Sequence, residues 1–288
     1  TDRRLMKTMN LLGRATVSFR SLPNIFLFGD SITEFGFGQN GQIGWASLLS
    51  STYSRRADVV SRGFSGYNTE HAKQILPSIL GTIGDGGGVS DGKSGTTSTP
   101  LLFSTVFFGA NDASLPTARQ HLALEDYCDN MRDIITTIRS HIHDDDDATN
   151  QHPDSGPPSP IILFTPPPVA PKAWDHFCTI TSPRPLSPRS NANCKLYGSA
   201  LMEIGKEMDC PVVDTYRLLG GDKGEEHYGR YLVDGIHLTG EGNNLVYEGL
   251  MEVIREELGD RGVLPLVEGE EEGGGGVPLD QKLWSEMC

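Results

Sequence analysis

Five short, mostly apolar runs recur along the chain, and each is separated from the next by a turn and a stretch with helical spacing. The runs cover residues 25–28, 58–60, 101–108, 161–164 and 211–214. Strands that are apolar at nearly every position are buried on both faces, as in a parallel sheet that lies between two layers of helices. We therefore expect an α/β fold, a three-layer α/β/α sandwich around a five-stranded parallel sheet.

Apolar residues at three- and four-residue spacing predict the helices that connect these strands. The clearest example is the long amphipathic segment that contains Leu124, Met131 and Ile138. The expected helices cover residues 44–53, 69–80, 124–142, 191–208 and 239–258.

One domain over residues 24–258 accounts for this regular pattern. Residues 1–23 are rich in basic side chains and are expected to be an N-terminal extension, either a targeting segment or a disordered arm. Gly, Ser, Thr, Asp and Pro dominate two polar insertions near 81–100 and 143–160, and an acidic, Gly-rich tail covers 259–288. Because the insertions precede the third and fourth strands, we expect them to lie away from the functional end of the sheet.

The net charge of −14 argues against a nucleic-acid partner, which would require a basic face. From Glu241 onward there are twelve acidic and three basic residues. Most of the negative charge therefore lies in the C-terminal part of the chain and says little about a binding site. No apolar run approaches the length that a membrane span needs. The expected partner is a small molecule, and the oligomeric state stays open.

The five cysteines form no C-x-x-C pair, which favours reduced thiols over a disulfide framework or a thiolate zinc site. This cysteine usage predicts an intracellular protein, cytoplasmic or organellar. We expect neither a metal nor a cofactor.

Two glycine patterns resemble nucleotide-binding motifs but lack the required context. The segment Gly87–Ser94 matches the phosphate-loop pattern, yet neither a strand pattern before it nor a helical pattern after it is present. The pattern Gly36-x-Gly38-x-x-Gly41 is separated from the end of the first strand by Gly29–Phe35, whereas a dinucleotide fingerprint begins where the strand ends. Both are interpreted as glycine-rich loops.

Residues that follow the strands fit one reaction together. Ser31 follows the first strand, Gly63 the second and Asn111 the third, while Asp234 and His237 precede the last helix. In parallel α/β sheets, ligands bind beyond the carboxyl ends of the strands. Each residue alone also has a structural interpretation, as a helix cap, a turn residue or a packed pair.

The chemistry explains why this set is informative. A serine hydroxyl needs a base to become a nucleophile, and His237 can be that base, oriented by Asp234. The oxyanion that forms during acyl transfer needs donors. The N–H groups of Ser31 and Gly63 and the amide of Asn111 can provide them.

Several sequence blocks resemble the GDSL, or SGNH, hydrolases. The segment Phe28–Thr33 resembles their opening block, and the four signature residues of that family map onto Ser31, Gly63, Asn111 and His237, with the triad aspartate on Asp234. Four further blocks are similar to the isoamyl acetate-hydrolysing esterase branch: Arg62–Thr69, Phe107–Asp112, Thr165–Pro168 and Asp234–Leu238. The resemblance implies a flavodoxin-like strand order 2-1-3-4-5. It also implies a carboxylic-ester hydrolase that acts on small, acetate-type esters through an acyl-serine intermediate.

Three alternatives remain open at this stage: an acyltransferase, a lysophospholipase or sugar-acetate esterase of the same fold, and a non-catalytic binding protein. Tyr67 and Trp174 either line the substrate pocket or pack in the core. Ser65, which lies in no nucleophile-elbow motif, is interpreted as a loop residue.

Overall fold

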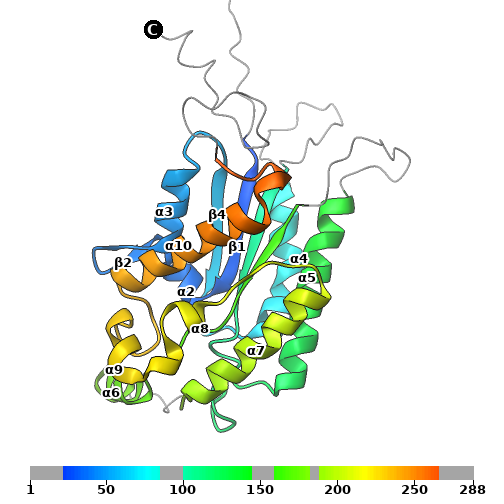
Figure 1. Cartoon of the computed structure of the whole chain (residues 1–288). Helices are drawn as coiled ribbons and strands as arrows, with labels where there is room; N and C mark the ends of the chain where they lie inside the picture. Colours follow the sequence, from blue (N-terminus) through cyan, green and yellow to red (C-terminus); the bar gives the residue numbers. More distant parts are fainter. Residues whose placement is uncertain (1–21, 85–99, 145–158, 182–187, 266–288) are drawn as a thin grey trace, which may run out of the picture.

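A parallel five-stranded sheet forms the centre of the computed structural model, which describes residues 22–84, 100–144, 159–181 and 188–265 (Figure 1). Its strands are hydrogen-bonded in the order β4-β1-β5-β6-β7. In chain order this is 2-1-3-4-5, so the expected fold and strand order are confirmed. The strand bounds are β1 (Asn24–Asp30), β4 (Asp58–Phe64), β5 (Leu101–Phe107), β6 (Ile161–Phe164) and β7 (Val212–Val213).

The central strand β1 shows why the sheet needs two layers of helices. Ile25 and Leu27 belong to one buried cluster, and Phe26 and Phe28 belong to the other, as the two-residue period of a strand requires. The first cluster includes residues of α3 (Trp45–Thr52) and α10 (Gly240–Glu257). The second includes residues of α4 (Thr69–Gly84), α5 (Leu124–Asp144) and α7 (Asn191–Glu207), which Figure 1 shows on the opposite side of the sheet.

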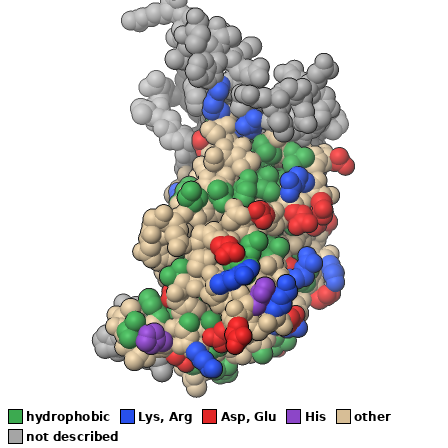
Figure 2. All heavy atoms as spheres, turned by 60° about the vertical axis from the view of Figure 1, so that its left-hand side comes forward, with side chains coloured by type: hydrophobic (Ala, Val, Ile, Leu, Met, Phe, Trp, Pro, Cys, Tyr) green, Lys and Arg blue, Asp and Glu red, His purple; other side chains and the backbone are tan. Residues whose placement is uncertain are grey.

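Charged side chains occupy the outward faces of the covering helices. On α7, for example, Lys195 pairs with Asp222 at 2.7 Å and Lys206 pairs with Glu203 at 2.8 Å. Figure 2 shows acidic and basic side chains interspersed with apolar ones on one face of the molecule. The net negative charge is therefore not gathered on that face.

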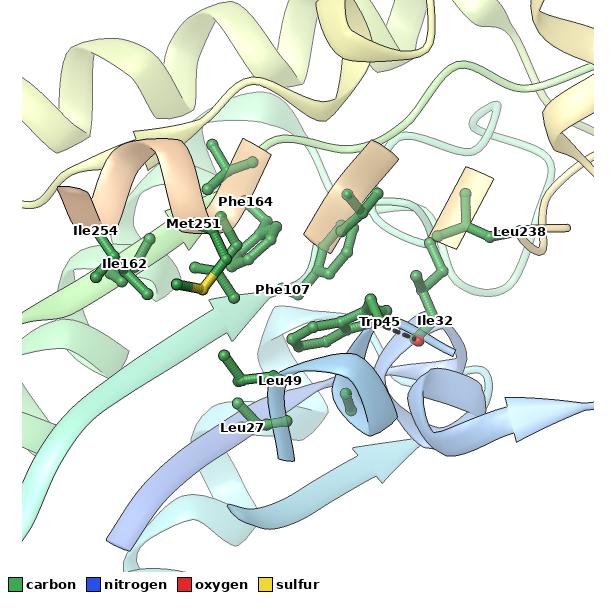
Figure 3. Packing of buried hydrophobic residues seen from close by; sticks show 14 of the residues in the cluster. Leu27, Ile32, Trp45, Leu49, Phe107, Ile162, Phe164, Leu238, Met251 and Ile254 are labelled. Carbon is green, nitrogen blue, oxygen red and sulfur yellow. Dashed lines mark hydrogen bonds between the residues drawn. The ribbon is translucent and has the colours of Figure 1, made fainter. Parts of the chain in front are cut away.

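The core beneath α3 and α10 supports the segment that follows β1. Trp45 packs against Phe107 and Phe164, with ring centroids 6.3 and 5.6 Å apart (Figure 3). Its indole N–H donates to the carbonyl oxygen of Ile32, at 3.3 Å. A fully buried side chain of this kind contributes about 1.5–3 kcal/mol by leaving water. The short helix α2 (Ser31–Glu34), which contains Ile32, thus rests directly on a packed core.

Two expected boundaries differ from the structure. Helix α4 continues to Gly84 with Ile83 buried, so the irregular segment expected from residue 81 begins later. Beyond α10, the carbonyl oxygen of Val263 accepts a 2.7 Å hydrogen bond from the Tyr53 hydroxyl, and Val263 is buried. The packed chain therefore extends past the expected domain end at 258. Most of both polar insertions, the phosphate-loop-like pattern and most of both terminal segments lie outside the described residues.

Several short elements were not predicted from the sequence. The pattern Gly36–Gly41 lies in a 3₁₀ turn and a small antiparallel hairpin, as expected for a loop and not for a helix N-terminus. These and most of the other unpredicted elements surround the carboxyl end of the sheet. They are η1 (Phe35–Phe37), β2 (Gly38–Gln39), β3 (Gln42–Ile43), α6 (Pro171–Thr181), α8 (Thr215–Leu218), η2 (Gly221–Lys223), α9 (Glu225–Tyr228) and η3 (Gly229–Tyr231). One more, η4 (Gly259–Arg261), lies at the amino-terminal end of the strands, where Arg261 pairs with Asp209 just before β7. Within the described ranges, no helix is both long and apolar enough to cross a membrane.

Candidate active site

Ser31 lies at the sharp turn from β1 into α2. The side chain of Asp30 caps this helix by accepting the N–H of Ile32 at 2.9 Å. A Cβ atom at Gly29 would lie 2.7 Å from the carbonyl oxygen of Phe107, so only glycine fits where the chain leaves the sheet. Ser31 is 8% exposed and its hydroxyl is directed at a histidine ring.

That ring belongs to His237, which arrives from the loop before α10. Its Nε2 lies 2.8 Å from the Ser31 hydroxyl oxygen, and its Nδ1 lies 2.6 Å from a carboxylate oxygen of Asp234. An ionised carboxylate only accepts hydrogen bonds, so Nδ1 carries the proton. The lone pair of Nε2 then faces the serine hydroxyl.

Asp234 is held by the turn that it caps. Its second oxygen accepts the N–H groups of Ile236 and His237, at 3.0 and 2.9 Å. Burial acts to raise the pKa of Asp234, but these bonds and the His237 ring outweigh it and lower the pKa below its ordinary value. Gly235 has φ +99° at this turn, and a side chain there would collide with the backbone of Ala170.

Gly63 and Asn111 reach the same edge of the sheet from the strands on either side of β1. Gly63 is paired in register with Gly29 and packs directly on the backbone of α2, where a Cβ atom would lie 2.6 Å from the Thr33 carbonyl carbon. Asn111 lies four residues beyond Phe107, the partner of Gly29 in β5, and is buried. The structure thus brings Ser31, Gly63 and Asn111 to adjacent strand ends.

The two aromatic candidates lie in different surroundings. Trp174, on α6, meets the His237 ring edge to face with centroids 6.3 Å apart, and it stacks on Phe177. The ring of Tyr67 stacks on Phe64, and its carbonyl oxygen accepts a 2.8 Å hydrogen bond from the Asn111 amide. Trp174 is therefore beside the reactive ring, while Tyr67 touches the site through its backbone.

Sequence reasoning missed two residues of this site. Phe35 also packs against the His237 ring, with centroids 5.2 Å apart. Arg189 is buried and donates to the side chain of Asn111 at 3.0 Å. Phe35 directly follows the serine-bearing helix, so its position was a usable signal, whereas nothing in the sequence around Arg189 marks it.

Two buried carboxyl groups lie behind the reactive residues. Burial raises the pKa of Asp30 to about 7 and that of Asp112 to about 6. Asp112 accepts the backbone N–H and the hydroxyl of Thr69, at 2.9 and 2.6 Å, and so ties α4 to the loop after β5. Asp30 thus holds the turn into α2 from within, while Asp112 connects two separate segments beside the site.

Ser65 occupies an exposed turn, where its N–H donates to the Glu34 carboxylate at 2.6 Å. The described contacts of Ser65 fit a loop residue, as the sequence predicted.

Residues 27–245 match the model of the GDSL-like Lipase/Acylhydrolase family. Curated relatives include the isoamyl acetate-hydrolyzing esterase 1 homolog of Mus musculus, 34% identical over 253 residues, with 87% of this chain and 89% of that protein covered. The human homolog is 31% identical over 247 residues, and 85% of each chain is covered.

Solved structures share the fold at lower identity. A carbohydrate acetylesterase family member from Sinorhizobium meliloti superposes with a TM-score of 0.56 at 20% identity, covering 83% of this chain and all of that one. A lipase/acylhydrolase from Enterococcus faecalis superposes with a TM-score of 0.54 at 21% identity, covering 81% of this chain and 96% of that one.

Proposed function

The chain is a serine ester hydrolase that belongs to the GDSL-like lipase/acylhydrolase family, and we propose that it cleaves small acyl esters through Ser31, His237 and Asp234. The observation that carries this proposal is the unbroken line of hydrogen bonds from Asp234 through His237 to the Ser31 hydroxyl. Such a line prepares a serine to lose its proton as it attacks a carbonyl carbon.

In the first half of the proposed reaction, His237 Nε2 takes the Ser31 proton while the serine oxygen bonds to the ester carbonyl carbon. The imidazolium then donates that proton to the alcohol oxygen as the ester C–O bond breaks. The alcohol departs, and an acyl-serine is left. In the second half, His237 takes a proton from water, whose oxygen attacks the acyl carbon. Return of the proton to Ser31 releases the carboxylic acid.

Both tetrahedral intermediates carry a negative oxygen, for which we propose three donors: the N–H groups of Ser31 and Gly63 and the Asn111 amide. Support comes from their position at adjacent strand ends and from the approach of the Gly63 backbone to α2. One such donor contributes about 2.7–4 kcal/mol of transition-state stabilisation.

The proposed substrate is an acetate-type ester with an apolar alcohol portion. Phe35 and Trp174 both pack against the His237 ring, and these apolar surfaces suit such a group. Two mammalian relatives carry the name isoamyl acetate-hydrolyzing esterase 1 homolog, which favours the same class. The test is a series of p-nitrophenyl esters of increasing acyl length. We expect kcat/KM to be highest for the acetate or butyrate ester, and a maximum at octanoate or longer would contradict the acyl assignment.

An acyltransferase would form the same acyl-serine and pass it to an alcohol instead of water. Product analysis with an added alcohol separates the two reactions. We expect the free acid as the main product, and a predominant new ester would favour transfer.

Substitution of Gly63 by alanine should disable the site through the backbone. The new methyl group would lie 2.6 Å from the Thr33 carbonyl carbon and closer still to the backbone nitrogen of Glu34, so β4 and α2 must separate. A displacement of about 1 Å at a reactive group can cost about a hundredfold in rate. We expect kcat to fall by about that factor, as measured with the acetate ester.

Gly81→Ala is the matched control, because no atom lies within 4 Å of a methyl group added there on α4. It should keep wild-type kcat and gain up to about 1 kcal/mol in free energy of unfolding. Wild-type kcat in Gly63→Ala would show that this close packing is not required.

A further inference from the structure

Arg189 is a buried cation with several acceptors around it. It is 7% exposed and lies in the connection between α6 and α7. The guanidinium donates to the carbonyl oxygen of Ala110, to Oδ1 of Asn111 at 3.0 Å and to Oε1 of Gln120 at 3.2 Å. It also lies over the Trp174 ring, with its central carbon 5.7 Å from the ring centroid.

These contacts allow only one orientation of the Asn111 amide. A guanidinium only donates hydrogen bonds and a backbone carbonyl only accepts them. Arg189 therefore requires the amide oxygen on its side, and the Tyr67 carbonyl, 2.8 Å from Nδ2, requires the amide nitrogen on the other. Rotating the amide by half a turn would break both bonds. One hydrogen of Nδ2 is used by Tyr67, and the second is left for another acceptor.

Gln120 extends the same network to the loop after β4. Its amide nitrogen donates to the carbonyl oxygen of Gly66 at 3.2 Å, and its backbone carbonyl oxygen accepts from the Asn68 amide at 3.0 Å. Arg189 thus joins the loop that carries Asn111 to the loop that follows Gly63.

The charge of Arg189 strengthens this arrangement. Burial lowers the pKa of the guanidinium, and nearby groups that include Asp30 act in the opposite direction. Arginine nevertheless stays protonated, because a guanidinium group does not lose its proton in proteins. A hydrogen bond from a cation is stronger than a neutral one, and it polarises the Asn111 amide so that Nδ2 becomes a better donor.

We propose that Arg189 is a positioning residue that holds the Asn111 amide with Nδ2 turned toward the developing oxyanion. The inference rests on the proposed function, since it assigns Asn111 as an oxyanion donor. Arg189 acts through Asn111 and not on the reacting atoms themselves.

The test is a double-mutant cycle with the acetate ester. In Arg189→Met we expect kcat to fall by about ten- to a hundredfold, less than the roughly 10²–10³ that removal of an oxyanion donor costs. KM should change little, because the oxyanion exists only in the transition state. In the Asn111→Ala background, Arg189→Met should have no further effect on kcat. Full additivity of the two losses, or wild-type kcat in Arg189→Met, would overturn the proposal.

Arg139→Met is the matched control, because Arg139 is a half-buried arginine on α5 that donates to the carbonyl oxygen of Met208. It should keep wild-type kcat.

If Arg189→Met does not fold, Arg189→Lys serves instead, since an ammonium group keeps the charge but cannot reproduce the planar hydrogen-bonding geometry of the guanidinium. A folded Arg189→Lys protein with wild-type kcat would also overturn the proposal. Wild-type protein without ester turnover or fluorophosphonate labelling would instead reject the proposed function.

Discussion

Replacing Ser31 with alanine should abolish covalent labelling by a fluorophosphonate and reduce ester turnover to background. The hydroxyl is the atom that His237 Nε2 contacts at 2.8 Å, and alanine leaves nothing to attack the carbonyl carbon. Loss of the nucleophilic serine in a serine protease lowers kcat by about 2 × 10⁶, which sets the scale. Labelling is measured by mass spectrometry of the intact protein, and turnover with the acetate ester.

The fold should survive this change. The cap of α2 is the Asp30 side chain, and the buried contacts of Ile32 do not involve the Ser31 hydroxyl. Ser65→Ala is the matched control, because Ser65 lies in an exposed turn whose backbone contacts Glu34 of the serine-bearing helix. It should label and turn over like the wild type. Persistent labelling of Ser31→Ala, lost when Ser65 is also changed, would move the nucleophile to Ser65.

Substitution of Asp234 by asparagine should lower kcat by up to about 10⁴ while the local turn is kept. The amide oxygen can still accept the N–H groups of Ile236 and His237. The amide nitrogen would then face Nδ1 as a donor, which forces the His237 proton onto Nε2. In that tautomer the ring has no lone pair directed at Ser31.

The same substitution should change the dependence of stability on pH. The folded-state pKa of Asp234 lies below its unfolded value, so the ionised carboxylate stabilises the fold above the unfolded pKa. That contribution is lost as the pH falls through the folded pKa. The deficit of Asp234→Asn in melting temperature should therefore be present at neutral pH and shrink in strong acid.

Asp214→Asn provides a matched control for Asp234→Asn. Asp214, like Asp234, accepts the backbone N–H of the residue three positions later, which is Arg217, and faces the side chain of that residue, but it lies in a different loop. It should keep wild-type kcat. Near wild-type turnover in Asp234→Asn, with an unchanged pH profile of kcat/KM, would remove Asp234 from the catalytic residues.

The strands could be predicted because a strand that is buried on both faces appears in the sequence as a run of consecutive apolar residues. The runs at Ile25–Phe28 and Ile161–Phe164 lie within β1 and β6, since every position of a central strand faces a helix layer. Once the strands are predicted, the residues at their carboxyl ends are known as well. A parallel sheet places these ends together at one edge. For this reason Ser31, Gly63 and Asn111 can be grouped from the sequence alone. The pairing of Asp234 with His237 at three-residue spacing follows from a local turn.

Elements without an apolar run or an apolar periodicity were not predicted. Helix α6 (Pro171–Thr181) contains no buried residue, so no apolar stripe distinguishes it from the loop that follows three prolines. The hairpin β2–β3 has two residues in each strand, which is too short for a periodic pattern. The end of α4 was set too early, because glycines around Leu80 interrupt a helix that packing nevertheless continues to Gly84.

By itself, the sequence determined the succession of strands and helices, the two helix layers and the reactive groups at the strand ends. Only the tertiary structure decided which residues surround those groups. Arg189 is the clearest example, since its burial depends on acceptors that lie about seventy to eighty positions away along the chain. A cation becomes a positioning residue through what it contacts after folding, and contacts at such separations leave no local pattern of spacing or polarity.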